Sequence, residues 1–484
     1  MSWFDTKPAS PRNWPSLVKA AAVIAEAVGD KKMICIWGHD DLDGAVGTAI
    51  LYAALRVMTS ALYCIPPKGG AQYGLDRAVI DKLIAKGVGL IVTVDCGISN
   101  AAEAEYARSK GLALVITDHH ELPDALPQAD AVVNPKIREK GAPFADLSGS
   151  GVSFCLSALI SGAAGDGWME ANREGLAWAA LATISDKAPL LEENRTILKL
   201  GLPCLAEHQA IGAIAAAIGL DLSYGLSHRI VSEHFVALLS GLVSEGFVHP
   251  TVEMLDGKVD PARVRERWIS RLEWRAKLGR EVEQKKGRLN PERESISVIV
   301  DEQLSPDMIG PLAGRLRDAC GFPVVVIGFK NGLHVGECRG FEPFDFTVML
   351  KALAADFVQA GGHKQAAGFT VKPNKLGETL VAIEEYAENR KSQIRSAVPK
   401  LSIAYRFNNV KDISELFAEL TANAPYGPGN PEPVCEIAGF IDAAEAGASY
   451  WLDDLIAKSG KGSHSVTASL DVTHTGKISL RVLS

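Results

Sequence analysis

Short apolar runs alternate with helix-like stretches between residues 33 and 133 of this chain. The runs are MICIW at 33–37, GLIVTV at 89–94, ALVIT at 113–117 and AVV at 131–133. This alternation is typical of a parallel sheet whose strands are joined by crossover helices. The sequence therefore predicts an α/β domain, and the ligands of such sheets bind beyond the carboxyl ends of the strands.

Candidate metal ligands lie where the apolar runs end. The first run leads into Gly38-His39-Asp40-Asp41-Leu42-Asp43-Gly44, in which His39, Asp41 and Asp43 alternate. Alternate side chains of an extended segment share one face, so these three can converge on a metal ion. Considered alone, the motif also fits an acidic loop that caps the next helix.

Three further clusters accompany the first motif. They are Asp95-Cys96-Gly97, Asp118-His119-His120 and Ile184-Ser185-Asp186, the last of which closes the apolar run ALATI. We expect each cluster to follow a strand-like run. Carboxylates brought together in this way need a cation to offset their repulsion. Asp and His ligands suit manganese or magnesium better than zinc, and bridging carboxylates can hold two ions about 3.5–4 Å apart for displacement at phosphorus.

The four motifs HDDLDG, VDCG, TDHHE and ISD resemble, in order and spacing, those of the DHH phosphoesterases. Other stretches resemble the RecJ exonucleases of that family, and these lie at 129–136, 144–154, 185–202, 305–316, 361–369 and 425–434. The resemblance implies a metal-dependent phosphodiesterase. More narrowly, it implies a RecJ-like 5′-to-3′ single-stranded-DNA exonuclease that releases nucleotides with water activated by two ions of manganese, or of magnesium.

The resemblance also implies roles for the site residues. Six would bind metal: His39, Asp41, Asp43, Asp95, His119 and Asp186. Asp41 would bind one ion, Asp43, His119 and Asp186 the other, and Asp95 would bridge the two. The catalytic residues would be Asp95, Asp118 and His120, with His120 stabilising charge at the scissile phosphate or protonating the leaving group.

Substrate binding is expected in a second domain. Within GGHKQAAG, the residues Gly361, Gly362 and His363 would bind substrate, because paired glycines let the backbone approach a phosphate closely. Arg339, in VGECRG, would hold a phosphate through two hydrogen bonds. Without the resemblance, GGH would indicate a glycine turn with an incidental histidine.

The chain departs from the resemblance at 236–246. RecJ proteins usually carry two arginines there, in Pro-Arg-x-Asn-Ala-Ala-Gly-Arg, whereas this chain reads VALLSGLVSEG. Because those arginines would contact nucleic acid, their absence favours an alternative, a phosphodiesterase for short oligonucleotides or signalling dinucleotides. A non-catalytic nucleic-acid-binding scaffold is a third hypothesis, and the retained ligand set speaks against it.

The chain has 484 residues, which is too long for one ordinary core. We expect four segments: a DHH catalytic α/β domain at 1–255, a long basic connecting helix at 256–295, a DHH-associated substrate-binding α/β domain at 296–396, and a small OB-like β-barrel at 397–484. The runs ISVIV and FPVVVIGF indicate strands of the second α/β domain, whereas short alternating runs such as SVTASLDVTH indicate the barrel.

The net charge of −8 means that a nucleic-acid site has to be a local basic surface. Between Arg263 and Arg288 there are ten Lys or Arg and four Glu, a net charge of +6. On a helix, Arg263, Arg267, Arg271 and Arg275 would form one stripe. Contact with phosphates and docking on the acidic body of the same protein both remain open.

The sequence opens without a basic segment followed by an apolar run, and no apolar stretch is long enough to span a bilayer. We therefore expect a cytoplasmic protein with no membrane partner. Eight cysteines without a CxxC pair predict reduced, mostly buried thiols. The expected partners are single-stranded DNA or short oligonucleotides, with a single-strand-binding protein or a helicase as candidate protein partners. The sequence does not indicate the oligomeric state.

Overall fold

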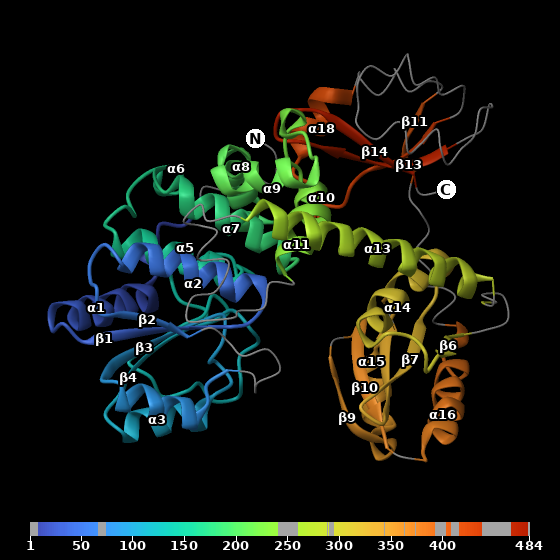
Figure 1. Cartoon of the computed structure of the whole chain (residues 1–484), viewed down its shortest axis with the longest axis horizontal. Coiled ribbons are helices and arrows are strands. Elements are labelled where there is room, and N and C mark those ends of the chain that lie inside the picture. The colour runs from blue at the N-terminus through green and yellow to red at the C-terminus, as the bar shows by residue number, and fades with distance from the viewer. Residues whose placement is uncertain are drawn as a thin grey trace. The chain divides into compact units, whose positions relative to one another are not determined.

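The computed structural model describes residues 8–65, 74–240, 260–287, 289, 295–342, 344–362, 364–372, 374–392, 403–407, 416–437 and 466–482. Its contacts divide the chain into two compact units, one of Met1–Trp268 with Ile403–Ser484 and the other of Ile269–Ser402. The predicted parallel-sheet α/β domain, long helix and second α/β domain are all present (Figure 1). The four-part division of the chain stays a prediction.

The first unit is built around a five-stranded sheet in the order β2-β1-β3-β4-β5, in which all neighbours are parallel. The strands are β1 (Met33–Gly38), β2 (Leu62–Ile65), β3 (Val88–Val94), β4 (Ala113–Thr117) and β5 (Ala131–Val133). The four predicted strands are confirmed. The edge strand β2 was not predicted: its run LYCI is apolar but only four residues long, and only Cys64 in it is buried.

Side chains of the sheet alternate between two hydrophobic cores. Ile34 and Ile36 pack in one core, whereas Cys35 packs in a second core on the opposite face. The first core includes α1 (Pro15–Gly29), α2 (Leu42–Leu55) and α5 (Gly149–Ile160), and the second includes α3 (Arg77–Ala85) and α4 (Ala101–Ser109). Figure 1 shows α1, α2 and α5 on one face of the sheet and α3 on the other. Because both faces are buried, these strands appear in the sequence as continuous apolar runs.

A helical region follows the sheet. It contains α6 (Trp168–Ala171), α7 (Arg173–Ser185), α8 (Glu192–Glu207), α9 (Gln209–Ile218), α10 (His228–Ile230), a π-helix at Val231–Val236 and α11 (Ala237–Leu239). The run ALATI lies in α7, so the expectation that Asp186 follows a strand-like run is wrong. Every residue from Leu176 to Ile184 is buried, and a helix buried all round lacks the polar face that would reveal its period.

The second unit contains a five-stranded sheet in the order β6-β7-β8-β10-β9. Its elements are β6 (Ser297–Val300), α14 (Pro306–Cys320), β7 (Val324–Lys330), β8 (Leu333–Arg339), α15 (Phe346–Ala352), β9 (Phe357–Gly362), β10 (Ala366–Val371) and α16 (Leu376–Glu388). The two predicted strands are confirmed as β6 and β7, which are parallel, whereas the other neighbours are antiparallel.

The C-terminal part of the first unit contains a four-stranded sheet in the order β11-β12-β13-β14. Its elements are β11 (Ile403–Phe407), α18 (Phe417–Asn423), β12 (Val434–Ile437), β13 (Val466–Val472) and β14 (Ile478–Val482). Leu420 and Tyr426 pack with this sheet in a small core. Residues 408–415 and 438–465 lie outside the described residues, and the OB-like barrel stays a prediction.

The basic segment forms the helix α13 (Pro261–Lys286), as its sequence predicts. The guanidinium of Arg271 lies 4.6 Å from the ring centroid of Trp274 on the same helix. All eight cysteines are free thiols, and all but Cys320 are buried, in agreement with the prediction. Among the described residues no single helix is long and apolar enough to cross a membrane, although the bent pair α8 and α9 passes the same test of length and composition.

Candidate metal centre

The carboxyl ends of β1, β3 and β4 place three motifs side by side. His39 follows β1, and Asp41 caps α2 by accepting a 2.9 Å hydrogen bond from the amide of Gly44. Asp95 follows β3 with φ of +61°, a left-handed conformation that a non-glycine residue keeps only where its surroundings hold it. Asp118-His119-His120 follow β4. Adjacent parallel strands thus bring separate motifs to one edge of the sheet.

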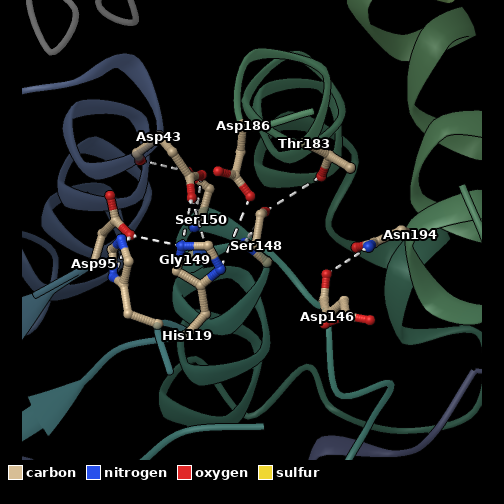
Figure 2. A network of polar contacts seen from close by, with 12 residues as sticks. Asp43, Asp95, His119, Asp146, Ser148, Gly149, Ser150, Thr183, Asp186 and Asn194 are labelled. Carbon is tan, nitrogen blue, oxygen red and sulfur yellow. Dashed lines mark hydrogen bonds and ion pairs between the residues drawn. The ribbon is translucent and has the colours of Figure 1, made fainter. Parts of the chain in front are cut away.

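Asp186 reaches the same place from the end of α7, and Figure 2 shows it beside Asp43 and His119. The ligand atoms fall into three overlapping groups, within each of which all atoms lie within 4.8 Å of one another: Asp43, His119 and Asp186; His39, Asp41 and Asp95; and Asp95, His119 and His120. Because Asp95 and His119 each belong to two groups, the three groups form one continuous cluster.

His119 lies at the centre of this cluster. Its Nε2 atom is 3.0 Å from Oδ1 of Asp95 and 3.9 Å from Oδ2 of Asp43. Its Nδ1 atom is 3.8 Å from Oδ2 of Asp186. The other oxygen of Asp95, Oδ2, lies 3.7 Å from Nδ1 of His39, and so the two oxygens of Asp95 face different ligand groups.

The first turn of α5 holds Asp43 in place (Figure 2). The amide of Gly149 donates to Oδ2 of Asp43 at 2.7 Å, and the amide of Ser150 donates to Oδ1 at 2.9 Å. A helix N-terminus favours a carboxylate through its dipole and its free amides. Position 149 also requires glycine, because a Cβ there would lie 2.7 Å from Oδ1 of Asp95. One helix end therefore constrains both Asp43 and Asp95.

Asp118 holds the loop that carries His120. Its Oδ1 atom accepts a 2.7 Å hydrogen bond from Nδ1 of His120 and a 2.7 Å bond from the amide of His119, while Oδ2 accepts from the amide of Ile98 at 2.9 Å. Asp118 is fully buried, whereas the His120 side chain is 41% exposed. The structure therefore places Asp118 behind His120, and none of the ligand groups among the described residues includes Asp118.

Asn134 and Lys136 support the same loop from the end of β5. Nδ2 of Asn134 donates to the carbonyl of His120 at 2.9 Å, and Nζ of Lys136 donates to the carbonyl of His119 at 2.7 Å. Oδ1 of Asn134 in turn accepts a 2.9 Å bond from the amide of Lys136. Both histidines are thus held through their backbone as well as through Asp118.

Burial and mutual repulsion raise the pKa values of three of the carboxylates. Burial, followed by the negative charges of Asp43 and Asp41, raises the pKa of Asp95 well above its ordinary value. Burial, followed by the charge of Asp43, raises the pKa of Asp186 to about 7. Burial also raises the pKa of Asp43, although nearby His119 acts in the opposite direction. A cation would relieve this repulsion.

The pKa values of the remaining two carboxylates, Asp41 and Asp118, are lowered instead. Burial alone would raise the pKa of Asp41, but hydrogen bonds with His39 and the amide of Gly44 outweigh it and lower the pKa to about 2. In the same way, hydrogen bonds from His120 and from the amide of Ile98 lower the pKa of Asp118 in spite of its burial. Both groups are therefore ionised at neutral pH.

The donor set fits a divalent ion. Oδ1 of Asp95 is buried and accepts no hydrogen bond of good geometry, although Nε2 of His119 lies 3.0 Å away, and burying a carboxylate oxygen in this way is costly. The surrounding donors are carboxylate oxygens and imidazole nitrogens, which suit hard or borderline cations. A divalent ion next to Asp95 would coordinate this oxygen and would also offset the negative charge of the carboxylates.

The predicted substrate-binding residues lie in the second unit. Arg339 ends β8 and is part-buried, and its guanidinium donates to the carboxylate of Glu337 at 2.9 Å and to the carbonyl of Cys338 at 2.8 Å. Gly361 and Gly362 end the edge strand β9 and are exposed. His363 lies outside the described residues. Phosphate binding by these residues stays a prediction.

Sequence reasoning gave no role to Gly149, Ser150, Asn134 or Lys136. The signal available was their presence in stretches that resemble RecJ, ADAVVNPK and FADLSGSGVSF. Their function depends on contacts with residues distant in the sequence, which neither stretch reveals by itself.

Two family models match the chain. A model of the DHH family, N-terminal domain, matches residues 33–183, and a DHHA1 domain model matches residues 294–389. The first match covers every candidate ligand except Asp186, which lies just beyond it, and the second covers Arg339 and the glycine pair.

Curated relatives align over much of the chain. The single-stranded-DNA-specific exonuclease RecJ of Bacillus subtilis is 28% identical over 468 residues, which cover 91% of this chain and 56% of that protein. The protein of the same name from Thermus thermophilus is 28% identical over 451 residues, covering 88% of this chain and 62% of that protein. This chain thus corresponds to less than two thirds of the length of either relative.

Solved structures share the fold. A crystal structure of exonuclease RecJ bound to manganese matches with a TM-score of 0.60 and 26% identity, covering 77% of this chain and 94% of that one. RecJ in complex with Mn²⁺ from Thermus thermophilus matches with a TM-score of 0.70 and 23% identity, covering 99% of this chain and 72% of that one. The chain thus carries a DHH N-terminal domain followed by a DHHA1 domain, and in sequence and fold it is similar to the RecJ exonucleases.

Proposed function

We propose that this chain is a divalent-metal-dependent phosphodiesterase that removes nucleotides from the 5′ end of single-stranded DNA. The observation that carries the proposal is the buried carboxylate of Asp95, which lies between a group containing His39 and Asp41 and a group containing His119. Its pKa is raised by burial and by neighbouring carboxylates, as expected for a ligand of cations. The named activity of the relatives supplies the substrate class.

Two ions, of manganese or magnesium, would complete the centre. One would be held by His39, Asp41 and Asp95, and the other by Asp43, His119 and Asp186. Asp95 would contact both, because its two oxygens face different groups. When bound, such ions lower the pKa of a water molecule and offset negative charge at the phosphorus atom.

His120 would act on the substrate. Its Nδ1 atom faces Oδ1 of Asp118 at 2.7 Å, and since that carboxylate is ionised at neutral pH, Nδ1 donates the hydrogen bond. The ring is thereby oriented, and Nε2 would stabilise the charge of a phosphate oxygen or protonate the leaving oxygen. Asp118 would be a positioning residue, although we expected it to be catalytic, because its carboxylate contacts His120 and backbone amides.

The polarity of the reaction can be tested with one strand labelled at either end. With Mn²⁺ and 5′-labelled single-stranded DNA, the proposal predicts early release of labelled mononucleotide while most of the strand is still long. With 3′-labelled DNA it predicts a ladder of progressively shorter labelled strands. The reverse pattern would contradict the proposed polarity, and cleavage at internal positions from the start would contradict exonuclease action.

A second candidate function is hydrolysis of short oligonucleotides or dinucleotides. It is favoured by the stretch at 236–246, which has no arginine where RecJ proteins usually carry two, and by the net charge of −8. A series of substrates from two to forty nucleotides separates the two functions. A kcat/KM that rises with length supports the exonuclease, whereas turnover confined to the shortest substrates supports the second function.

A further inference from the structure

A turn in the C-terminal segment, residues 423–430, packs against the chain just after Asp186. The amide of Leu190 donates a 2.6 Å hydrogen bond to the carbonyl of Pro428. The approach leaves no space for a side chain on Gly427, because a Cβ there would lie 2.8 Å from Cδ1 of Leu190 and 2.9 Å from Cδ2 of His228. Gly429 has φ of +78° and also faces Leu190, so the turn is fitted closely to this segment.

Arg195, a residue of α8, binds the turn through hydrogen bonds. Its side chain is fully buried, and its guanidinium donates to the carbonyls of Asn423 at 3.0 Å, Ala424 at 2.8 Å and Pro425 at 3.2 Å. Nδ2 of Asn430 donates to two of the same carbonyls, those of Asn423 and Pro425, at 2.8 Å each. A buried charge is tolerated only when it is well hydrogen-bonded, so this network gives the turn a defined position on α8.

The segment that the turn contacts, at Leu190, follows directly after Asp186 of the metal centre. Asp186 is the C-cap of α7, and the next residue, Lys187, has φ of +59°, so the chain reverses sharply. The amide of Ala188 donates to the carbonyl of Thr183 at 3.2 Å, and Leu190 is fully buried. Little freedom remains between Asp186 and Leu190, and a shift of Leu190 therefore moves the end of α7.

The neighbouring Asn194 joins this segment to the loop before α5. Its Nδ2 atom donates to the carbonyl of Pro189 at 3.1 Å and to the carbonyl of Asp146 at 2.8 Å, the second of which Figure 2 shows. That loop precedes the first turn of α5, which holds Asp43. Among Asp43, His119 and Asp186, the side chain of Asp186 is the most exposed, at 28%, and so has the least support from its immediate surroundings.

We propose that the 423–430 turn is a positioning element for Asp186. The C-terminal segment then sets the affinity of the group Asp43, His119 and Asp186 for its divalent ion, in addition to any contact with nucleic acid. The inference rests on the proposed function of the cluster as a metal centre. It makes a folded C-terminal segment a condition for tight binding of the second ion.

The test uses the full chain freed of metal and titrated with Mn²⁺, with bound ion followed by calorimetry and free ion by electron paramagnetic resonance. Gly427→Ala pushes directly on Leu190, whereas Asn430→Ala removes two hydrogen bonds from the turn without creating an overlap. Each variant is expected to weaken one of two Mn²⁺ sites by about 10-fold or more, the usual size of an effect transmitted through a ligand's support. Excess Mn²⁺ should restore turnover.

Thr475→Val is the matched control. Thr475 also lies in the C-terminal segment, but outside the 423–430 turn, and the substitution removes the 2.7 Å hydrogen bond that its hydroxyl donates to the carbonyl of Tyr224. Its Mn²⁺ affinity should equal that of the wild type. If Asn430→Ala is folded by circular dichroism and binds Mn²⁺ as tightly as the wild type does, the inference is overturned. This holds even if Gly427→Ala fails to fold. Absence of any Mn²⁺ binding by the wild type would instead overturn the proposed function, and the inference with it.

Discussion

The backbone amide of Gly149 donates a 2.7 Å hydrogen bond to Oδ2 of Asp43, and Gly149 packs against Asp95 so closely that a Cβ would lie 2.7 Å from Oδ1 of that residue. The N-terminus of α5 is thus shaped around two carboxylates that carry raised pKa values. A helix end of this kind stabilises negative charge where a metal ion is to be bound.

Gly149→Ala should weaken Mn²⁺ binding by about 10-fold or more, because the new methyl group displaces Asp95 or opens the contact with Asp43. Gly165→Ala is the control, since a Cβ at that position meets nothing within 4 Å. Calorimetric titration of both variants checks the prediction. Equal Mn²⁺ affinity in the two variants would show that the close approach at position 149 is irrelevant to the metal centre.

Asp118→Asn should lower kcat by about 100-fold or more, because the neutral amide oxygen polarises the hydrogen bond from Nδ1 of His120 far less than the carboxylate does. Mn²⁺ affinity should change little, since Asp118 lies outside the ligand groups. Steady-state kinetics and Mn²⁺ titration on the same preparation separate the two effects. A loss of Mn²⁺ binding that parallels the loss of kcat would make Asp118 a ligand instead of a positioning residue.

Metal binding should depend on pH and release protons. Burial and the charge of Asp43 raise the pKa of Asp186 to about 7 in the metal-free protein, so below that pH a divalent ion has to displace a proton. Mn²⁺ affinity is expected to rise between pH 6 and 8. Calorimetry in two buffers with different ionisation enthalpies measures the protons released, and an affinity that is flat over this range would contradict the prediction.

Stability should depend on pH through Asp471, which lies away from the metal centre. Burial raises the pKa of Asp471 to about 7, although Arg229 acts in the opposite direction. Since this pKa lies above the unfolded value of about 4, the contribution to stability is fully present below about pH 4 and is lost as the pH rises through about 7. Asp471→Asn should therefore show a smaller fall in Tm between pH 5 and 8. Parallel Tm curves for the variant and the wild type would exclude this role.

The sequence predicted most directly the strands of the first sheet that are buried on both faces. The strands β1, β3 and β4 were found because they are apolar throughout, and their ends located His39, Asp95 and Asp118. The run before Asp186 has the same apolar character but lies in a helix, since full burial removes the periodicity that separates the two structures. Strand β9 escaped prediction because all its residues after Phe357 are exposed.

The candidate ligands were found because each stands in a short motif at the end of an element. The residues that support them were not found, because they act across the fold. Gly149 approaches Asp95 from another element, and Arg195 binds a turn in the C-terminal segment. Such contacts are set by tertiary packing, and local sequence carries no direct record of them.

Asp95 and a divalent ion acting together are central to the proposed reaction. The decisive measurement is hydrolysis of single-stranded DNA in Mn²⁺ by the wild type and by Asp95→Asn, which keeps the shape of the side chain but removes its charge. Turnover by the wild type is expected to be abolished by a chelator and to be lowered by about 1,000-fold or more in Asp95→Asn, with the fold intact. Hydrolysis that persists in chelator, or that Asp95→Asn leaves unchanged, would contradict the proposed reaction.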